Sequence, residues 1–366
     1  MVNLKDIIGV LESVAPPELQ EDYDNSGLQV SHTDQDILGI LITLDVTEAV
    51  MDEAVRKKCN LVLAHHPILF HGLKRIDETT DAGRALRKAI LHSIHIYAIH
   101  TNLDNVKAGV NGRIAGRLGL ADTRVLLPKE NVFSKLVTFC PPEIVRPLLD
   151  ALHGAGAGII GNYDHCSFRV PGTGSFRPND QARPFTGETG RLEETREERI
   201  EVQFPSWQEE QILEALLETH PYEEVAYYIQ RVDHASSRIG SGIIGKLEKP
   251  LASGKFLSFI KEKLELNRIR FTPVIEEKMI DQVACCGGSG SFLIDRAISE
   301  GADAFITADV KYHEFFRAEG RMMLADIGHY ESEKFTKDLL LDLLNKKFSN
   351  IALLLSEINT NPVRYL

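Results

Sequence analysis

The stretch "LVLAHHPILFHG" at residues 61–72 is the part of the sequence that most narrows the fold. Its apolar residues predict a buried strand over 61–67, which ends in two adjacent histidines and a proline. Neighbouring side chains on a strand point to opposite faces, so a single ion could not easily be held by both His65 and His66. Either one histidine is incidental or two centres lie there. Pro67 favours an extended backbone at His66, which lets the pair diverge toward two neighbouring sites.

The segments around this strand alternate between strand and helix patterns. In the first series, strands are predicted over 37–46, 61–67 and 95–104, with helices over 47–59 and 82–93 between them. A second series is predicted to contain strands over 279–286, 304–310 and 321–328 and helices over 292–300 and 332–348. This alternation is typical of an α/β protein with a mainly parallel sheet. We therefore expect two α/β halves.

The region between the two series has a different amino-acid composition. Glycine and proline cluster over 153–190, and a charged run over 191–204 suits an exposed strand. The predicted elements are a strand, a helix, two strands, a helix and a strand, in the βαββαβ order of ferredoxin-like domains. We expect an α/β core formed by 1–125 and 245–366, interrupted by an inserted α+β domain over 126–244.

Composition limits the classes of function. The chain has 366 residues, a formal net charge of -12 and 43% hydrophobic residues. Its acidity makes nucleic acid an improbable partner, because binding to phosphates needs a basic surface. Five cysteines without a C-x-x-C pair are a poor disulfide framework and fit a reducing cytoplasm. The first sixteen residues predict an amphipathic helix rather than a signal peptide, and no run reaches the roughly 18 apolar residues of a membrane span.

Candidate metal ligands follow three predicted strands. His65 and His66 end one strand, His100 and Asp104 end another, and His329 and Glu333 lie four residues apart at a predicted helix start. Residues at i and i+4 share a face of a helix, whereas Glu331 is expected to face solvent. Open α/β sheets place their sites beyond the carboxyl ends of strands.

The chemistry of these side chains favours a transition metal. Imidazole mixed with carboxylate suits zinc, iron, manganese or cobalt better than magnesium or calcium. Five ligands, His65, His66, Asp104, His329 and Glu333, are too many for one tetrahedral catalytic ion that also keeps a water. They suit two ions about 3.5–4 Å apart that share a carboxylate. One histidine of the adjacent pair would then serve each metal.

Two further motifs allow more than one interpretation. The run "CCGGSGSFLID" (285–295) could bind an anion at a helix N-terminus, but it lacks the features of a P-loop, and a tight strand-to-helix turn is the alternative. In "TADVKYHEFF" (307–316), Lys311 and His313 are either groups that face the substrate or solvated loop residues.

Several motifs together resemble a known family. The segments "YDNSGLQV", "LAHHPILF", "HTNLDNVKAGVN", "CGGSGSFLIDRAISEGADAFITADVKYHEF" and "DIGHYESE" resemble the GTP cyclohydrolase type 2 homologues, also called the Nif-three-like family. The segments "GNYDHCSF", "GTGSFRP" and "HPYEEVAYYI" are similar to the CutA/PII-like domain inserted in longer bacterial members. Tyr23 replaces the usual tryptophan of a W-D-N-x-G-L pattern, and Asp309 replaces a glutamate often found in the family.

The resemblance implies a dinuclear centre formed by His65, His66, Asp104, His329 and Glu333, with Glu333 bridging the metals. It also implies a ring-shaped homohexamer whose metal sites face an internal cavity. From the residues, we expect a metal-dependent hydrolase, with His100 as the candidate for proton transfer. Its substrate is expected to be a phosphoester or, as the resemblance to GTP cyclohydrolase homologues implies, a nucleotide-like molecule. The alternative is a non-catalytic metal-binding or regulatory assembly.

Overall fold

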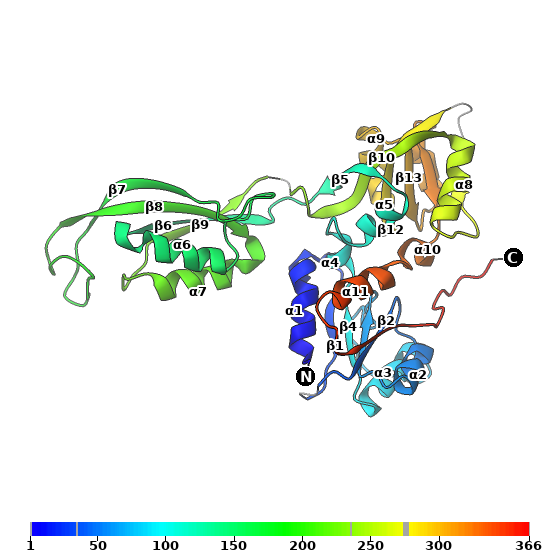
Figure 1. Ribbon diagram of the computed structural model, residues 1–366, viewed down its shortest axis with the longest axis horizontal. Helices are drawn as coiled ribbons and strands as arrows, with labels where there is room; N and C mark the ends of the chain where they lie inside the picture. The colour runs from blue at the N-terminus through cyan, green and yellow to red at the C-terminus, as the bar shows by residue number, and fades with distance from the viewer. Residues whose placement is uncertain (1, 34–35, 235, 274–277, 366) are drawn as a thin grey trace. The chain divides into compact units, whose positions relative to one another are not determined.

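The computed structural model describes residues 2–33, 36–234, 236–273 and 278–365 (Figure 1). The chain divides into two compact units. Unit 1 contains Met1–Pro128 and Arg238–Leu366, and unit 2 contains Lys129–Ser237. Together they form a mixed α/β structure with three sheets. Among the described residues, none of the helices has the length and apolar character needed to cross a membrane.

The first sheet of unit 1 carries the adjacent histidines. Its strands lie in the order β1 (Gly27–Val30), β4 (His95–Ala98), β3 (Leu61–Ala64), β2 (Gly39–Thr43) and β15 (Ala352–Leu355). All neighbouring pairs are parallel except β1 with β4. The helices around it are α1 (Leu4–Val14), α2 (Glu48–Arg56), α3 (Asp81–Leu91) and α11 (Thr336–Asn345).

Alternating residues of β2 show how both faces of this sheet are covered. Ile40 packs in the cluster that includes Ile7 of α1. Leu41 belongs to a separate cluster with Met51 of α2 and Ala85 of α3. Helices therefore cover both faces, which explains why the strands are apolar runs rather than alternating patterns.

The second sheet of unit 1 has six strands. Their order is β11 (Arg270–Phe271), β14 (Met323–Asp326), β13 (Ala304–Ala308), β12 (Met279–Ser289), β10 (Gly240–Ala252) and β5 (Ala121–Pro128). Its surroundings include α5 (Val110–Arg117), α8 (Ser253–Lys263), η4 (Ser291–Leu293), α9 (Ile294–Ser299) and η5 (Tyr312–Ala318). Three short elements, η1 (Pro17–Leu19), α4 (Thr101–Asp104) and α10 (His329–Glu333), complete the unit.

One apolar cluster spans both sheets. Ile42 and Leu63 of the first sheet belong to the same buried cluster as Cys285 and Ile306 of the second. Burial of each such side chain is worth about 1.5–3 kcal/mol. This shared core fixes the two sheets relative to each other within unit 1, and with them the polar groups at the ends of their strands.

The two sheets differ from the two sequence halves that we expected. Strand β15, near the C-terminus, pairs in parallel with β2 of the first sheet, whereas β5, from the first half, pairs with β10 of the second sheet. Local patterns predict where a strand lies but not which strand is its partner. The strand predicted over 95–104 is also shorter, since β4 ends at Ala98 and residues 101–104 form α4.

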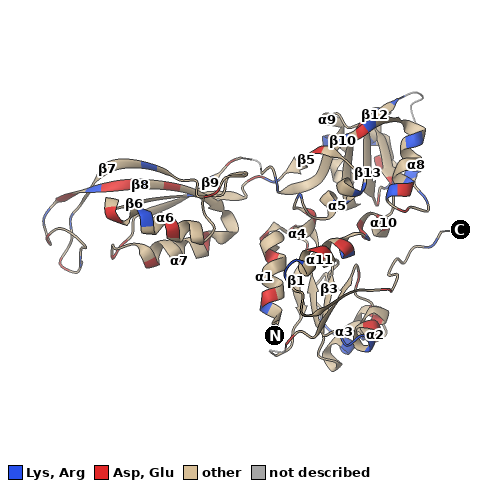
Figure 2. Cartoon of the chain, viewed as in Figure 1, with Lys and Arg blue, Asp and Glu red and all other residues tan. Residues whose placement is uncertain are grey.

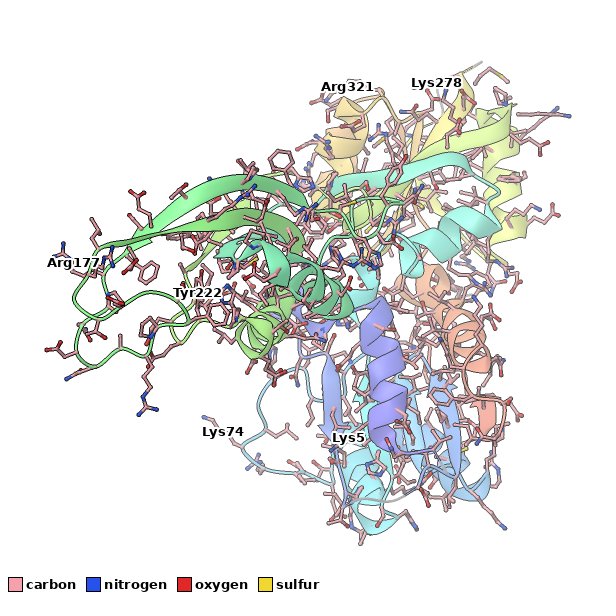
Figure 3. The ribbon with its side chains drawn as sticks, turned by 60° about the vertical axis from the view of Figure 1, so that its left-hand side comes forward. Lys5, Lys74, Arg177, Tyr222, Lys278 and Arg321 are labelled. Carbon is pink, nitrogen blue, oxygen red and sulfur yellow. The ribbon has the colours of Figure 1, made fainter. Side chains whose placement is uncertain are left out.

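Unit 2 has the βαββαβ order expected from the sequence. Its elements are β6 (Phe133–Cys140), η2 (Pro142–Ile144), α6 (Val145–Gly154), β7 (Phe168–Phe176), β8 (Glu193–Pro205), η3 (Ser206–Gln208), α7 (Glu209–Thr219) and β9 (Tyr227–Val232). The antiparallel sheet has the order β7-β8-β6-β9. Charged residues of both signs lie along β8 (Figure 2). The Tyr222 side chain (Figure 3) donates a hydrogen bond from its hydroxyl to Glu197 Oε1 at 2.9 Å.

The expected limits of the insertion, 125/126 and 244/245, fall inside β5 and β10. These strands pair with each other, and Gly240 lies opposite Pro128 at the end of the ladder. The paired strands belong to unit 1, so the chain leaves and re-enters unit 1 at neighbouring points. The local patterns predict no strand in unit 1 over 121–128 or 240–252, so this pairing is visible only in the structure.

We predict that replacing 129–237 with a short Gly/Ser turn leaves unit 1 folded, because the turn only has to connect two paired strands. Circular dichroism and a cooperative melting transition are the measurements. Replacing the longer range 126–244 is the matched comparison, and it should lower the melting temperature because it removes paired residues of β5 and β10. Loss of soluble protein for the shorter replacement would contradict an independent unit 1.

Candidate metal centre

The polar residues of the site come from strand ends in both sheets of unit 1. From the first sheet, Asp45 follows β2, His65 and His66 follow β3, and His100 and Asp104 follow β4. From the second sheet, Asp309 follows β13, and α10 follows β14 and carries His329 and Glu333. Carboxyl ends of parallel strands gather at one edge of a sheet, which explains how residues distant in sequence become neighbours.

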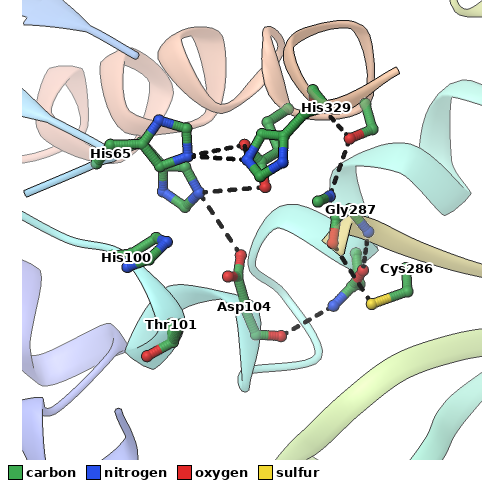
Figure 4. A network of polar contacts seen from close by, with 12 residues as sticks. His65, His100, Thr101, Asp104, Cys286, Gly287 and His329 are labelled. Carbon is green, nitrogen blue, oxygen red and sulfur yellow. Dashed lines mark hydrogen bonds and ion pairs between the residues drawn. The ribbon is translucent and has the colours of Figure 1, made fainter. Parts of the chain in front are cut away.

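Figure 4 shows His65, Asp104 and His329 in one network of polar contacts. Glu333 lies at the centre of these contacts. Its Oε2 is 3.0 Å from His66 Nε2 and 3.1 Å from His329 Nε2. Its Oε1 is 3.9 Å from His65 Nε2, which also lies 3.7 Å from Asp104 Oδ1. The structure thus brings together all five residues that the sequence nominated as ligands.

The expectation that His65 and His66 point to opposite faces is wrong. Their ring centroids are only 4.9 Å apart, and the Nε2 atoms of both face Glu333. The alternation of side chains holds along a strand, but β3 ends at Ala64, one residue before the pair. Both rings can therefore turn toward the same pocket.

A second set of contacts fixes the orientation of each imidazole ring. The Nδ1 partners are Ile99 O for His65 (2.8 Å), Asp45 Oδ1 for His66 (2.7 Å), Asp24 Oδ1 for His100 (2.7 Å) and Asp309 Oδ2 for His329 (2.6 Å). A neutral ring that donates from Nδ1 keeps an acceptor lone pair on Nε2. This arrangement is common for histidines that bind metals. The shorter side chain of Asp309 still reaches His329.

The buried polar atoms of the site fit a cation. In the part of the chain that the structure describes, His65 Nε2 and Asp104 Oδ1 have no hydrogen-bond partner. Buried polar atoms are almost always paired, so these two atoms, 3.7 Å apart, indicate a missing partner that accepts electron pairs. Within the described ranges, two groups of side chains could hold metal ions, His65 with His66 and His100, and His66 with His329 and Glu333.

In the protein without metal, protons on the imidazole rings balance the negative charge of the carboxylates. Burial disfavours the charged imidazoles, but hydrogen bonds to Asp45 and Glu333 raise the pKa of His66 to about 10, and Glu333 and Asp309 raise that of His329 to about 9. Burial opposes ionisation of Glu333, yet hydrogen bonds from His329, His65 and His66 hold its pKa well below the usual value. Divalent cations would take over the neutralising role of these protons.

The donors face a cavity of about 740 Å³. Aromatic side chains line it, namely Tyr23, Phe70, Phe292, Tyr330 and Tyr365. The carboxylates along it are Glu21, Asp45, Asp104, Asp309, Asp326, Glu331 and Glu333. Arg270 is the one Lys or Arg among the described lining residues, and it forms an ion pair with Asp326. The cavity is therefore acidic and has aromatic walls.

The glycines after Cys286 do not form the tight turn that was the alternative, because Gly287 and Gly288 lie within β12, at an irregularity in its pairing with β13. Their amides already donate to side chains, from Gly287 to Asn111 (2.9 Å) and from Gly288 to Ser332 (2.9 Å). These contacts leave little capacity for an anion. Gly288 has φ +61, and a Cβ there would lie 2.4 Å from Glu333 Oε1, so a residue without a side chain is needed for Glu333 to approach.

The other nominated residues have different surroundings. His100 lines the cavity and lies with His65 and His66, as a candidate ligand as well as a proton carrier. Lys311 and His313 are exposed and do not line it, which favours the solvated interpretation. Glu331 does not face solvent as expected, because it lines the cavity and accepts a hydrogen bond from Asn361 Nδ2 at 2.9 Å.

Sequence reasoning overlooked several residues of the site. Asp45 directly follows a strand, which is the signal that identified the other ligands and could have found it. Asp24 lies in the quoted "YDNSGLQV" motif, but nothing in that motif indicates that its carboxylate contacts His100. Thr360 and Asn361 lie in an extended segment without a motif, so no sequence signal indicated them.

Known proteins resemble this chain over its whole length. The curated "GTP cyclohydrolase 1 type 2 homolog" of Bacillus subtilis (strain 168) is 39% identical over 374 residues, covering 100% of this chain and 99% of the relative. The homolog of the same name from Staphylococcus epidermidis is 34% identical over 369 residues, with both chains covered completely.

Solved structures show the same fold. A Bacillus cereus protein related to NIF3 superimposes with a TM-score of 0.86 at 35% identity, covering 100% of this chain and 99% of that one. A Staphylococcus aureus protein gives a TM-score of 0.78 at 28% identity, with the same coverage. The family described as Duf34/NIF3 (NGG1p interacting factor 3) matches residues 2–362. The chain belongs to the Duf34/NIF3 family.

Proposed function

We propose that this protein is a dinuclear metal-dependent hydrolase that acts on a nucleotide-like or phosphoester substrate. The observation that carries the proposal is that five imidazole and carboxylate side chains lie together and four of them line one cavity. Two of the five, His65 and Asp104, have buried atoms without a hydrogen-bond partner. His65, His66, Asp104, His329 and Glu333 would hold two divalent ions of zinc, iron or manganese, with Glu333 between them. Its two oxygens face different histidines, which supports the bridging role.

A pair of divalent cations supplies Lewis acidity and activates water near neutral pH. The chain's own residues would do the rest. His100 lines the cavity, and its Nδ1 lies 2.7 Å from Asp24 Oδ1, so Asp24 fixes the ring and leaves Nε2 directed away from the carboxylate. His100 would carry the proton between water and the leaving group. Asp24 is itself held by Thr101, whose backbone amide donates to Oδ2 at 3.0 Å.

The lining of the cavity supports the substrate class. Tyr23 and Phe70 stack with ring centroids 6.3 Å apart and offer an apolar surface to a planar ring. Because carboxylates dominate the lining, a phosphate group would be bound through the metals rather than through basic side chains. The name shared by the curated relatives, a homolog of GTP cyclohydrolase, agrees with a nucleotide-like ring.

We predict that purified protein reconstituted with zinc, manganese or iron holds close to two ions per chain. Replacing Glu333 with Gln should remove most of the metal, because it deletes the buried negative charge that His65, His66 and His329 surround. Elemental analysis and a panel of nucleotides and phosphoesters are the measurements. The matched control is Glu319→Gln, an exposed glutamate paired with Arg321, which should keep both metal and turnover.

The outcomes separate the two functional hypotheses. Turnover that is lost with Glu333→Gln and kept with Glu319→Gln supports the hydrolase. Full metal occupancy without turnover across all three metals contradicts it and favours the non-catalytic or regulatory assembly. Absence of metal after reconstitution contradicts both.

We predict that metal binding releases protons and weakens as the pH falls. The folded protein raises the pKa of His66 to about 10 and that of His329 to about 9, so both rings hold protons at neutral pH until metal displaces them. Titration with zinc at pH 7.5 in buffers of different ionisation enthalpy should show release of roughly two protons per chain. A proton count near zero would contradict protonated ligands in the metal-free protein.

We also propose the ring-shaped homohexamer that the family resemblance implied. A small-molecule ligand would then enter the metal pocket from an internal cavity of the assembly. The expected result of light scattering at micromolar concentration is six times the chain mass of 40.9 kDa. A monomeric mass would contradict the proposal.

A further inference from the structure

The C-terminal segment 356–365 runs from the first sheet to the metal pocket. After β15, Ser356 donates its backbone amide to Ile42 O at 2.8 Å and its hydroxyl to the buried Glu53. The segment continues as extended chain (red in Figure 1). Asn361, Pro362, Val363 and Tyr365 all line the cavity that contains the candidate ligands.

One contact connects this segment to a candidate ligand. The Thr360 hydroxyl donates to Asp45 Oδ2, and the other oxygen of the same carboxylate, Oδ1, lies 2.7 Å from His66 Nδ1. Asp45 therefore has one oxygen on the segment and one on the ring. The hydroxyl prevents the carboxylate from turning, and the carboxylate sets the plane of the imidazole.

A second contact connects the same segment to the other side of the pocket. Asn361 is buried, and its Nδ2 donates to Glu331 Oε1 at 2.9 Å. Glu331 belongs to α10, the five-residue helix that also carries His329 and Glu333. The side-chain oxygen of Asn361 accepts the amide of Val363 at 3.0 Å, so the asparagine is held on both sides.

We propose that 359–365 is a strap that positions the metal ligands from both sheets, with Thr360 as the positioning residue for His66 through Asp45 and Asn361 as the anchor of α10. The inference rests on the proposed metal-binding function and extends it to residues that touch no metal. Outer contacts of this kind typically change metal affinity by about 10–100-fold. Thr360 acts through one intermediate carboxylate, that of Asp45. Removal of the Thr360 hydroxyl should therefore weaken the affinity for zinc by up to about tenfold.

The test compares Thr360→Val, which keeps the shape and removes the hydroxyl, with Thr360→Ser, which keeps the hydroxyl. Zinc affinity is measured by competition with a chromophoric chelator, and the geometry of the site by the visible spectrum of the cobalt-loaded protein. We expect Thr360→Val to weaken zinc binding and alter the cobalt spectrum, and Thr360→Ser to restore both. Melting temperatures of the metal-free variants show whether folding has changed.

A double-mutant cycle with Asp45→Asn tests the route. If Thr360 acts through Asp45, the double variant should bind zinc no more weakly than Asp45→Asn alone. Additive losses would overturn the route through Asp45, and wild-type affinity with an unchanged cobalt spectrum in Thr360→Val would overturn the positioning role.

The wild-type titration separates the two proposals. If wild-type protein binds no metal, the proposed function and this inference both fail. If wild-type protein binds metal and Thr360→Val behaves identically, only the strap is wrong.

Discussion

The buried negative charge of Glu333 is the constraint on which the rest of the site depends. An ionised carboxylate that is nearly inaccessible to water is costly unless positive charge or hydrogen bonds surround it. Three imidazoles from two sheets approach it, and glycine at 288 makes the close approach of its Oε1 possible. The site therefore requires that the two sheets be fixed relative to each other, and the apolar cluster shared by them meets this requirement.

Much of this arrangement could be predicted from sequence because the signals are local. An apolar run that ends in His65 and His66, or a short helix that carries His329 and Glu333, identifies both the element and the chemistry of its end. Because α/β proteins place their sites at the carboxyl ends of strands, these ligands are then predicted to lie close together. Each of these inferences needs only the residues next to the motif.

The remaining features depend on contacts between segments distant in sequence. The pairing of β15 with β2 and of β5 with β10 follows from the global packing, which local periodicity does not encode. The position of Glu331 on the helix predicted that its side chain faces solvent. The C-terminal segment instead lies against that side of α10, and Asn361 donates a hydrogen bond to Glu331. The opposite-face expectation for the adjacent histidines failed because the strand ends at Ala64, three residues earlier than the predicted strand over 61–67.

The outer partners of the imidazoles connect these observations to function. Asp24, Asp45 and Asp309 each hold one ring nitrogen, and the free nitrogens then point into the same cavity. Three further carboxylates near two candidate ligand carboxylates would be unfavourable in a pocket that holds no cations, since like charges repel strongly where water is excluded. Protons on His66 and His329 relieve only part of this repulsion. The acidity of the pocket is thus itself an argument for divalent cations, because they oppose the carboxylates and leave the imidazoles neutral.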